Sequence, residues 1–242
     1  MIRPHAAIVL SAGRGERLRP ITDTLPKPLV PVAGRALLDH AIDRLEAAGI
    51  ATVVVNTHHL AGQISAHLAA RPGPRILISH EAEQALETGG GIARALPLLG
   101  DEPFFAVNSD SLWLDGKVPA LTRLARAWDD ARHDALLLLQ RTATAVGYDS
   151  QTGDFLLDQL GVPRWRRQGE VAPYLYAGVQ LLSPRLFRDV RPEPFSVRAL
   201  WRRAIEDGRL DAIVHDGEWY HVSTPAGLAL VRNRLDTHRT ER

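Results

Sequence analysis

The chain has 242 residues, 45% of them hydrophobic and 24% charged, with a net charge of +1 at pH 7 and no cysteine. This composition excludes an intrinsically disordered chain, disulfides, thiolate metal sites and cysteine nucleophiles, and the near-zero charge excludes a whole-protein field that attracts nucleic acid. No apolar run approaches the roughly 20 residues that cross a bilayer, and the first residues lack a secretory cleavage site, so we expect a cytoplasmic protein without membrane or nucleic-acid partners.

The first predicted strand, residues 6–10, ends in a loop that carries far more charge than a strand-to-helix connection requires. Gly13 and Gly15 allow the backbone to approach a ligand closely, and the neighbouring cations can surround a polyphosphate. Leu18 stands where a dinucleotide fingerprint needs its third glycine, and no Gly-Lys-Ser/Thr follows, so neither that motif nor a Walker A loop fits. The sequence predicts a phosphate-binding loop of another type. Its cations are Arg14, Arg17, Arg19 and Lys27.

Strands and helices alternate from this loop to about residue 140. Apolar periodicity predicts helices over residues 36–48, 60–68, 91–98 and 118–130, and strands over residues 52–56, 75–79, 104–107 and 135–140. The alternation is typical of βαβ units in a mainly parallel sheet, whose ligands bind at the carboxyl ends of the strands. We therefore expect the loop after Leu10, the segment after Ser79 and the residues after Val107 to converge.

Beyond residue 141 strands and helices no longer alternate. Short strands are predicted over residues 155–157, 163–165 and 174–182, and helices over residues 197–206 and from Pro225 onward, where Thr224 is the expected N-cap. We predict one α/β domain, residues 1–242, with a β-rich insertion over the carboxyl edge of the sheet.

Four motifs occur in a fixed order: Gly13-Arg-Gly15-Glu-Arg17-Leu-Arg19-Pro with Pro26-Lys27-Pro28, then Glu87-Thr-Gly-Gly-Gly91, Asn108-Ser-Asp110 and Trp219-Tyr-His-Val-Ser-Thr-Pro225. Together they resemble the signature of the sugar-phosphate nucleotidyltransferases, or NDP-sugar pyrophosphorylases, over nearly the whole chain. The resemblance implies a Rossmann-like, glycosyltransferase-A-like fold. About residues 1–140 would bind the nucleotide, and about residues 141–242 would bind the sugar phosphate and include the C-terminal helix. It also implies transfer of a nucleoside monophosphate from an NTP to a sugar 1-phosphate, with release of pyrophosphate.

Within this family, the segment at residues 87–91 and the compact length are most similar to the members that act on N-acetylmuramate 1-phosphate in cell-wall sugar recycling. The expected substrates are then UTP and that sugar phosphate. Mannose-1-phosphate guanylyltransferases share much of the pattern, and glucose-1-phosphate nucleotidyl transfer is a further alternative. A non-catalytic nucleotide-sugar sensor or regulatory subunit is the alternative from another class. We expect small-molecule partners and a monomer or small homo-oligomer.

The resemblance assigns Arg17 to the triphosphate and Lys27 to the reacting phosphorus, and makes Asp110 the catalytic carboxylate. In-line attack brings two anions together, so positioning and charge neutralisation should dominate catalysis. Only two of the 29 lysines and arginines are lysines, which favours a specific role for Lys27. The implied nucleotide-binding residues are Leu10, Ser11, Ala12, Gly13, Gly15, Gly89, Gly90 and Asn108. The implied sugar-phosphate-binding residues are Glu87, Thr88, Asp154 and Gly178.

The chain departs from the family pattern at two places. Relatives carry Asp where His221 stands, and that Asp joins the residue equivalent to Asp110 on Mg²⁺. His221 could bind a softer ion such as Mn²⁺, it could contact phosphate, or Mg²⁺ could rest on Asp110 and substrate phosphates, which we favour. Many relatives also supply a lysine for the sugar phosphate, but none follows Lys117 here. The candidate replacements, which the sequence does not rank, are Arg141, Arg164, Arg166 and Arg198.

Overall fold

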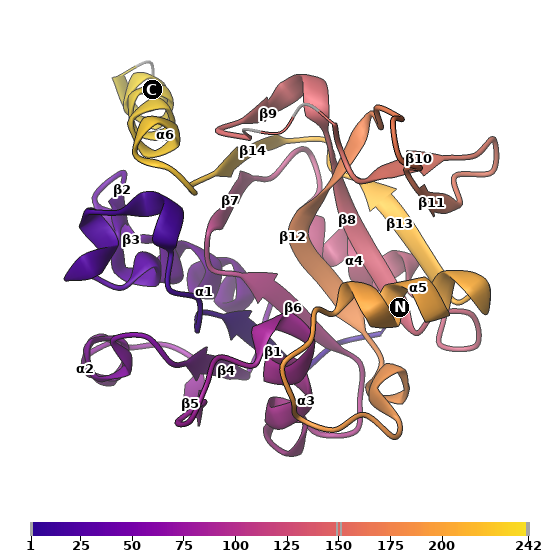
Figure 1. The fold of residues 1–242 in the computed structure, drawn as a ribbon, viewed down its shortest axis with the longest axis horizontal. Helices are drawn as coiled ribbons and strands as arrows, with labels where there is room; N and C mark the ends of the chain where they lie inside the picture. Colours follow the sequence, from indigo (N-terminus) through magenta and orange to yellow (C-terminus); the bar gives the residue numbers. More distant parts are fainter. Residues whose placement is uncertain (1, 149, 151, 241–242) are drawn as a thin grey trace.

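A computed structural model describes residues 2–148, 150 and 152–240 (Figure 1). Nine strands form the central sheet: β1 (Ala6–Leu10), β4 (Thr52–Thr57), β5 (Arg75–His80), β6 (Phe104–Asn108), β8 (Ala135–Arg141), β10 (Phe155–Leu157), β11 (Pro163–Trp165), β12 (Tyr174–Leu182) and β13 (Leu210–Val214). The helices are α1 (Leu37–Ala47), α2 (Ala61–Ala69), α3 (Glu87–Leu99), α4 (Ala120–Ala127), α5 (Arg198–Glu206) and α6 (Pro225–Thr240). None of the helices in the described part of the chain has the length and apolarity needed to span a membrane.

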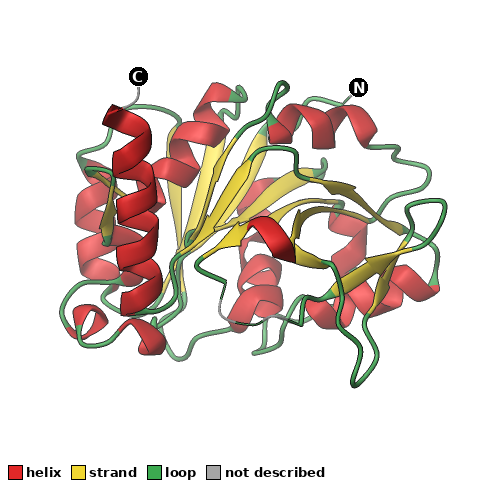
Figure 2. Ribbon diagram, turned by 90° about the horizontal axis from the view of Figure 1, so that it is seen from above, coloured by secondary structure: helices red, strands yellow, loops and turns green. Residues whose placement is uncertain are grey.

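Alternating side chains of the central strands build two hydrophobic layers. In β1, Ala7 and Val9 belong to one buried cluster while Ile8 belongs to another, as the two-residue repeat of a strand requires. Residues of α1, α2 and α4 complete the first cluster, and residues of α3 and α5 complete the second. Helices therefore cover both faces of the sheet (Figure 2). This arrangement confirms the predicted α/β class.

The order of the strands creates a crevice beside β1. Strands β4 and β5 follow β1 on one side in parallel, whereas β6 pairs with β1 in parallel on the other side. Successive strands are thus added on one side of β1 as far as β5, and β6 is the first strand added on its other side. Such a switch point leaves an opening at the carboxyl ends of the two adjacent strands. Here these ends are Leu10 and Asn108, which are register partners.

Beyond β6 the sheet becomes mixed. Strand β12 runs antiparallel to both β6 and β8, and its register with β8 shifts between Tyr176 and Gln180. The first residues of β12 carry β10 and β11 (Figure 1), so the predicted β-rich insertion continues the central sheet. The sequence analysis did not predict β13, which pairs in parallel with β8.

A third hydrophobic cluster fixes the basic loop, residues 11–34, against the C-terminal part of the chain. Leu18, Val30 and Val32 are fully buried in it and pack with residues of α6. The guanidinium of Arg232 in α6 donates to the backbone oxygen of Pro31. Two small sheets join this layer: β2 (Pro31–Val32) with β3 (Arg35–Ala36), and β7 (Ser111–Leu114) with β14 (Glu218–His221) and β9 (Ala145–Val146).

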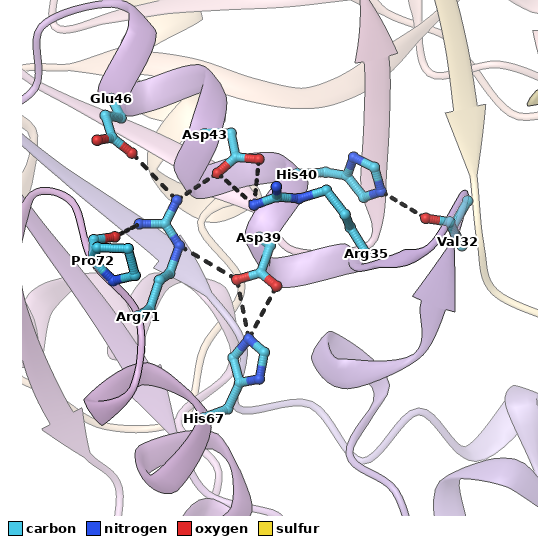
Figure 3. A network of polar contacts seen from close by, with 9 residues as sticks. All are labelled: Val32, Arg35, Asp39, His40, Asp43, Glu46, His67, Arg71 and Pro72. Atoms are coloured by element: carbon cyan, nitrogen blue, oxygen red, sulfur yellow. Dashed lines mark hydrogen bonds and ion pairs between the residues drawn. The ribbon is translucent and has the colours of Figure 1, made fainter. Parts of the chain in front are cut away.

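A network of charged side chains joins α1 to the end of α2 (Figure 3). Arg71 lies at its centre and forms ion pairs with Asp39, Asp43 and Glu46, all from α1. His67 of α2 contacts the same Asp39 carboxylate. Because the Arg71 side chain is only 9% exposed, its carboxylate partners replace water that the guanidinium loses on folding.

Candidate active site

A cavity of about 800 Å³ opens at the carboxyl ends of β1 and β6. The three segments that the sequence analysis expected to converge all line it, so that prediction is confirmed. The lining residues are Leu10, Ser11, Ala12, Gly13, Arg14, Gly15, Glu16, Arg17, Lys27, Pro28, Asn56, Ala85, Glu87, Thr88, Asn108, Ser109, Asp110, Ser196 and Ser223.

The fold of the basic loop depends on Gly15. Its φ of +64° is a left-handed conformation that glycine adopts without strain, and a Cβ there would lie 2.9 Å from Thr22 and 3.0 Å from Lys27. The absent side chain lets Lys27 close over the loop, and the Thr22 hydroxyl donates to the Gly15 oxygen at 2.9 Å. Lys27 begins a short 3₁₀ turn, Lys27–Leu29, between two prolines that restrict the backbone.

A buried relay of hydrogen bonds, which sequence reasoning missed, supports the opposite side of the loop. The Ser11 N–H donates to Asn56 Oδ1, and Asn56 Nδ2 donates to Glu81 Oε1, both at 2.7 Å. The other carboxylate oxygen of Glu81 accepts the Leu86 N–H at 2.7 Å, just before α3. The relay therefore links the ends of β1, β4 and β5. Its signal in the sequence was a polar residue in the last positions of an apolar strand or just beyond its end, where ligand sites form.

Lys27 and Asp110 form the polar centre of the cavity. Lys27 Nζ lies 2.6 Å from Asp110 Oδ2, and the two side chains are 14% and 25% exposed. Burial by itself raises the pKa of Asp110, but the Lys27 ammonium and a hydrogen bond with His221 lower it to well below its usual range. Asp110 is therefore expected to be a carboxylate at neutral pH.

His221 reaches Asp110 through a pairing that the sequence analysis did not predict. Strand β14 runs antiparallel to β7, with His221 opposite Ser111, next to Asp110 in the chain. His221 Nε2 lies 3.5 Å from Asp110 Oδ2, and its ring stacks on Trp219 at 5.7 Å between centroids. Its other nitrogen, Nδ1, is buried and has no hydrogen-bond partner among the described residues. The ring is thus held by packing, with Nε2 directed at the carboxylate.

The residues present fit a divalent ion that takes most of its ligands from substrate. Asp110 offers one partly exposed carboxylate on the cavity wall, and His221 offers a nitrogen beside it. Within the described ranges, no group of three or more His, Cys, Asp or Glu side chains could enclose a metal ion. Mg²⁺ often uses one or two carboxylates together with phosphates and waters, which is the donor set available here.

The structure places only part of the segment at residues 87–91 on the cavity wall. Helix α3 begins at Glu87, earlier than the predicted residue 91. Glycine has a low helix propensity, so propensity argues against a helix over residues 89–91, whereas close packing requires glycine there. A Cβ on Gly89 would lie 2.3 Å from the Phe195 ring, and one on Gly90 would lie 2.0 Å from the Glu193 oxygen. Neither of these two glycines is among the lining residues, whereas Glu87 and Thr88 are. Nucleotide binding by Gly89 and Gly90 stays a prediction.

Asp154 and Gly178 do not line the cavity either, and both have structural contacts. The Asp154 carboxylate accepts the Tyr176 N–H at 3.0 Å and the Arg198 guanidinium at 3.1 Å. Gly178 has a φ of +78°, and a Cβ there would lie 2.2 Å from Ser111 Oγ. Their predicted roles in sugar-phosphate binding stay predictions.

The four candidate arginines have different surroundings. Arg164 is paired with Glu170, and Arg166 donates to the Gly153 oxygen, both in the β10–β11 region. Arg141 is an exposed residue at the end of β8. Arg198 lies two residues after Ser196, which lines the cavity. Arg198 also contacts the β10–β11 region, through Asp154 and the Trp165 ring, and it is the one of the four that closely follows a lining residue in the chain.

Comparison with known proteins shows the family of the chain. A family model described as nucleotidyl transferase matches residues 6–148. The N-acetylmuramate alpha-1-phosphate uridylyltransferase of Caulobacter vibrioides is 45% identical over 236 residues, covering 96% of this chain and 97% of that protein. The protein with the same description from Neisseria meningitidis is 35% identical, covering 90% of this chain and 93% of that protein.

The fold also matches solved structures. A UDP-glucose pyrophosphorylase complexed with UDP-glucose superposes with a TM-score of 0.80 at 16% sequence identity, covering 98% of this chain and 100% of that chain. At that identity the likeness concerns the fold alone. The family that the motifs indicated is confirmed by the family model and by the two curated relatives. The chain belongs to the nucleotidyl transferase family.

Proposed function

We propose that the protein transfers UMP from UTP to N-acetylmuramate 1-phosphate, forming the UDP-sugar and pyrophosphate. The observation that carries the proposal is the Lys27–Asp110 pair, 2.6 Å apart, on the wall of a cavity bounded by the basic loop. The choice of substrates is supported by the 45% identity to the Caulobacter vibrioides uridylyltransferase over nearly the full length of both chains.

In the proposed reaction an oxygen of the sugar phosphate attacks the α-phosphorus of UTP. A new P–O bond forms as the bond to the bridging α–β oxygen breaks, and pyrophosphate leaves with that electron pair. The attacking phosphate is already ionised at neutral pH, so no general base is needed. Catalysis then consists of aligning two anions and neutralising the charge between them.

The chain supplies that neutralisation from the basic loop. We assign the exposed cations Arg14 and Arg17 to the triphosphate, because both line the cavity. Lys27 is assigned to the oxygens of the reacting phosphorus, where its compact ammonium can leave Asp110 for a phosphate oxygen. The backbone of residues 10–13 and Gly15, with Asn108, would hold the nucleoside, and Glu87 and Thr88 would contact the sugar.

Enzymes of this family generally use a divalent metal ion. In our proposal Asp110 holds the ion, Mg²⁺ or Mn²⁺, with substrate phosphates, and His221 is its neighbour. The ion would screen charge on the phosphates when bound. Because UTP is a cytoplasmic metabolite, we place the reaction in the cytoplasm.

The test is pyrophosphate release by the purified protein, with UTP, GTP, CTP, ATP and dTTP each paired with the 1-phosphates of N-acetylmuramate, N-acetylglucosamine, glucose and mannose. We expect the highest kcat/KM for UTP with N-acetylmuramate 1-phosphate, in Mg²⁺ or Mn²⁺. A preference for GTP with mannose 1-phosphate would replace the proposed substrates. Nucleotide binding without pyrophosphate release from any pair would favour a sensor. Asp110→Asn, measured in parallel, should abolish release.

A further inference from the structure

Arg198 begins α5, two residues after Ser196. Ser196 lines the cavity, and the next residue, Val197, donates its N–H to Thr88 Oγ1 at 3.0 Å. The start of α5 is therefore tied to the start of α3. Arg198 follows directly, so its backbone is fixed relative to the cavity although its side chain is half exposed.

The Arg198 side chain is held by two contacts, which leave N–H donors of its guanidinium for a further acceptor. Its Nη2 lies 3.1 Å from Asp154 Oδ1, and its guanidinium carbon lies 5.5 Å from the centre of the Trp165 ring. Among the described residues, Asp154 and the Trp165 ring are the two partners of the Arg198 guanidinium. Because the Arg198 side chain is 52% exposed, the pair with Asp154 contributes little to stability and can be exchanged for another anion.

Tyr176 connects Arg198 electrostatically to the reacting centre. Its hydroxyl is buried without a hydrogen-bond partner among the described residues, although Gln180 lies close enough to lower its pKa. Burial raises that pKa, Asp110 raises it further, and Arg198 lowers it. The same strand makes the connection in space: the Tyr176 N–H holds Asp154, the partner of Arg198, and two residues later a Cβ on Gly178 would lie 2.2 Å from Ser111 Oγ, next to Asp110 in the chain.

We propose that Arg198 binds the carboxylate of a sugar-acid acceptor and thereby selects N-acetylmuramate 1-phosphate over N-acetylglucosamine 1-phosphate. This inference rests on the proposed function. The two acceptors differ by one lactyl ether, which adds a carboxylate to the first. In the proposed reaction the reacting phosphate lies beside Lys27 and Asp110, so Arg198, which is not among the lining residues, is left for the second anion of the acceptor.

The chemistry of the pair favours a carboxylate. A guanidinium presents parallel N–H donors that match the two oxygens of a carboxylate, and Arg198 already pairs with one in Asp154. Asp154 is then a positioning residue. Its second oxygen accepts the Tyr176 N–H, so its carboxylate is fixed to β12 while it directs the guanidinium.

The test compares Arg198→Gln with Arg202→Gln. Arg202 is the matched control because it lies one turn later on α5, with its guanidinium 6.0 Å from the same Trp165 ring. The two acceptors are assayed with UTP, and an acceptor that is not turned over is measured as a competitive inhibitor. We expect Arg198→Gln to reduce the preference for N-acetylmuramate 1-phosphate by about 10- to 100-fold, mainly through KM or Ki, and Arg202→Gln to leave it unchanged.

Two results would overturn the proposal while leaving the proposed function intact: an equal loss for both acceptors, or an unchanged preference. Arg198→Lys keeps the charge but loses the parallel N–H donors, so we expect an intermediate preference for N-acetylmuramate 1-phosphate. Equal thermal midpoints for the variants and the wild type exclude unfolding as the cause. A wild-type enzyme that does not use N-acetylmuramate 1-phosphate would overturn the proposed function and this inference together.

Discussion

Lys27 and Asp110 are 83 positions apart in the chain, and Nζ of the first lies 2.6 Å from Oδ2 of the second. The contact joins the basic loop after β1 to the residues after β6, across the point where the sheet changes its direction of growth. In the proposed reaction this cation and carboxylate would separate to receive a phosphate and a metal ion. The pair is thus the part of the site in which a substitution should affect catalysis most directly.

Replacing Lys27 with alanine should lower kcat by about 100-fold or more, because a donor that meets developing charge is lost. Lys27→Arg should also be impaired, since Gly15 and Thr22 leave a space shaped around the lysine stem. Initial rates of pyrophosphate release measure both effects. The fold should survive because Asp110 keeps some solvent contact, which thermal unfolding checks. Activity of Lys27→Ala within tenfold of the wild type would contradict the assigned role.

Replacing His221 with aspartate should strengthen metal binding. The new carboxylate would lie beside Asp110, where His221 Nε2 is now 3.5 Å from Oδ2, and Mg²⁺ prefers oxygen ligands to imidazole. We expect the Mg²⁺ concentration for half-maximal binding, measured by calorimetry with UTP present, to fall by about tenfold. His221→Ala is the control. If it binds Mg²⁺ as the wild type does, the ion rests on Asp110 and phosphates, whereas complete loss would make His221 a required ligand.

Replacing Gly90 with alanine should destabilise the fold. The added Cβ would lie 2.0 Å from the Glu193 backbone oxygen, so α3 or the segment at residues 193–195 must shift. Such overpacking costs about 1–3 kcal/mol in the free energy of unfolding, measured with urea. Gly62→Ala is the matched control, because nothing lies within 4 Å of its added Cβ in α2. That variant should be equal to the wild type or more stable, and a similar loss in both would exclude the steric explanation.

The stability of the fold should fall at mildly acidic pH because of His215. Burial lowers the pKa of His215 below its usual value of 6.5, while the Glu218 and Leu114 oxygens partly oppose that shift. The unfolded chain therefore takes up a proton first. The contribution of His215 is present above about pH 6.5 and is lost as the pH falls toward the lower pKa of the folded state.

His215→Gln tests this dependence, since glutamine can still donate a hydrogen bond to a backbone oxygen without titrating. The free energy of unfolding at pH 7.5 and pH 5.5 should differ less in the variant than in the wild type. An identical difference in the two proteins would show that His215 does not contribute to the dependence.

Replacing Arg71 with methionine should destabilise the α1–α2 layer (Figure 3). The buried guanidinium serves three carboxylates, which would be left facing one another, so we expect a loss of about 1–3 kcal/mol in the free energy of unfolding. Arg35→Met is the matched control, because Arg35 pairs with Asp43 but its side chain is 53% exposed. It should lose less than about 1 kcal/mol. Equal losses would show that burial of Arg71 does not matter.

Local sequence patterns were sufficient to place the alternating strands and helices of the first 140 residues and the basic loop. Apolar runs such as residues 52–56 specify a buried strand locally, and a run of glycines, prolines and cations specifies a ligand loop without reference to the rest of the chain. The order of the motifs also indicated the family, which the relatives confirm.

The contacts between side chains, by contrast, could be seen only in the folded chain. The relay from Ser11 through Asn56 to Glu81, the pairing of β7 with β14 that brings His221 to Asp110, and the ion pair of Arg198 with Asp154 join residues far apart in sequence. Periodicity also gave no sign that Gly89 and Gly90 receive Phe195 and Glu193. Local patterns report how a segment folds, whereas contacts between distant segments depend on strand register and close packing, which no single segment encodes.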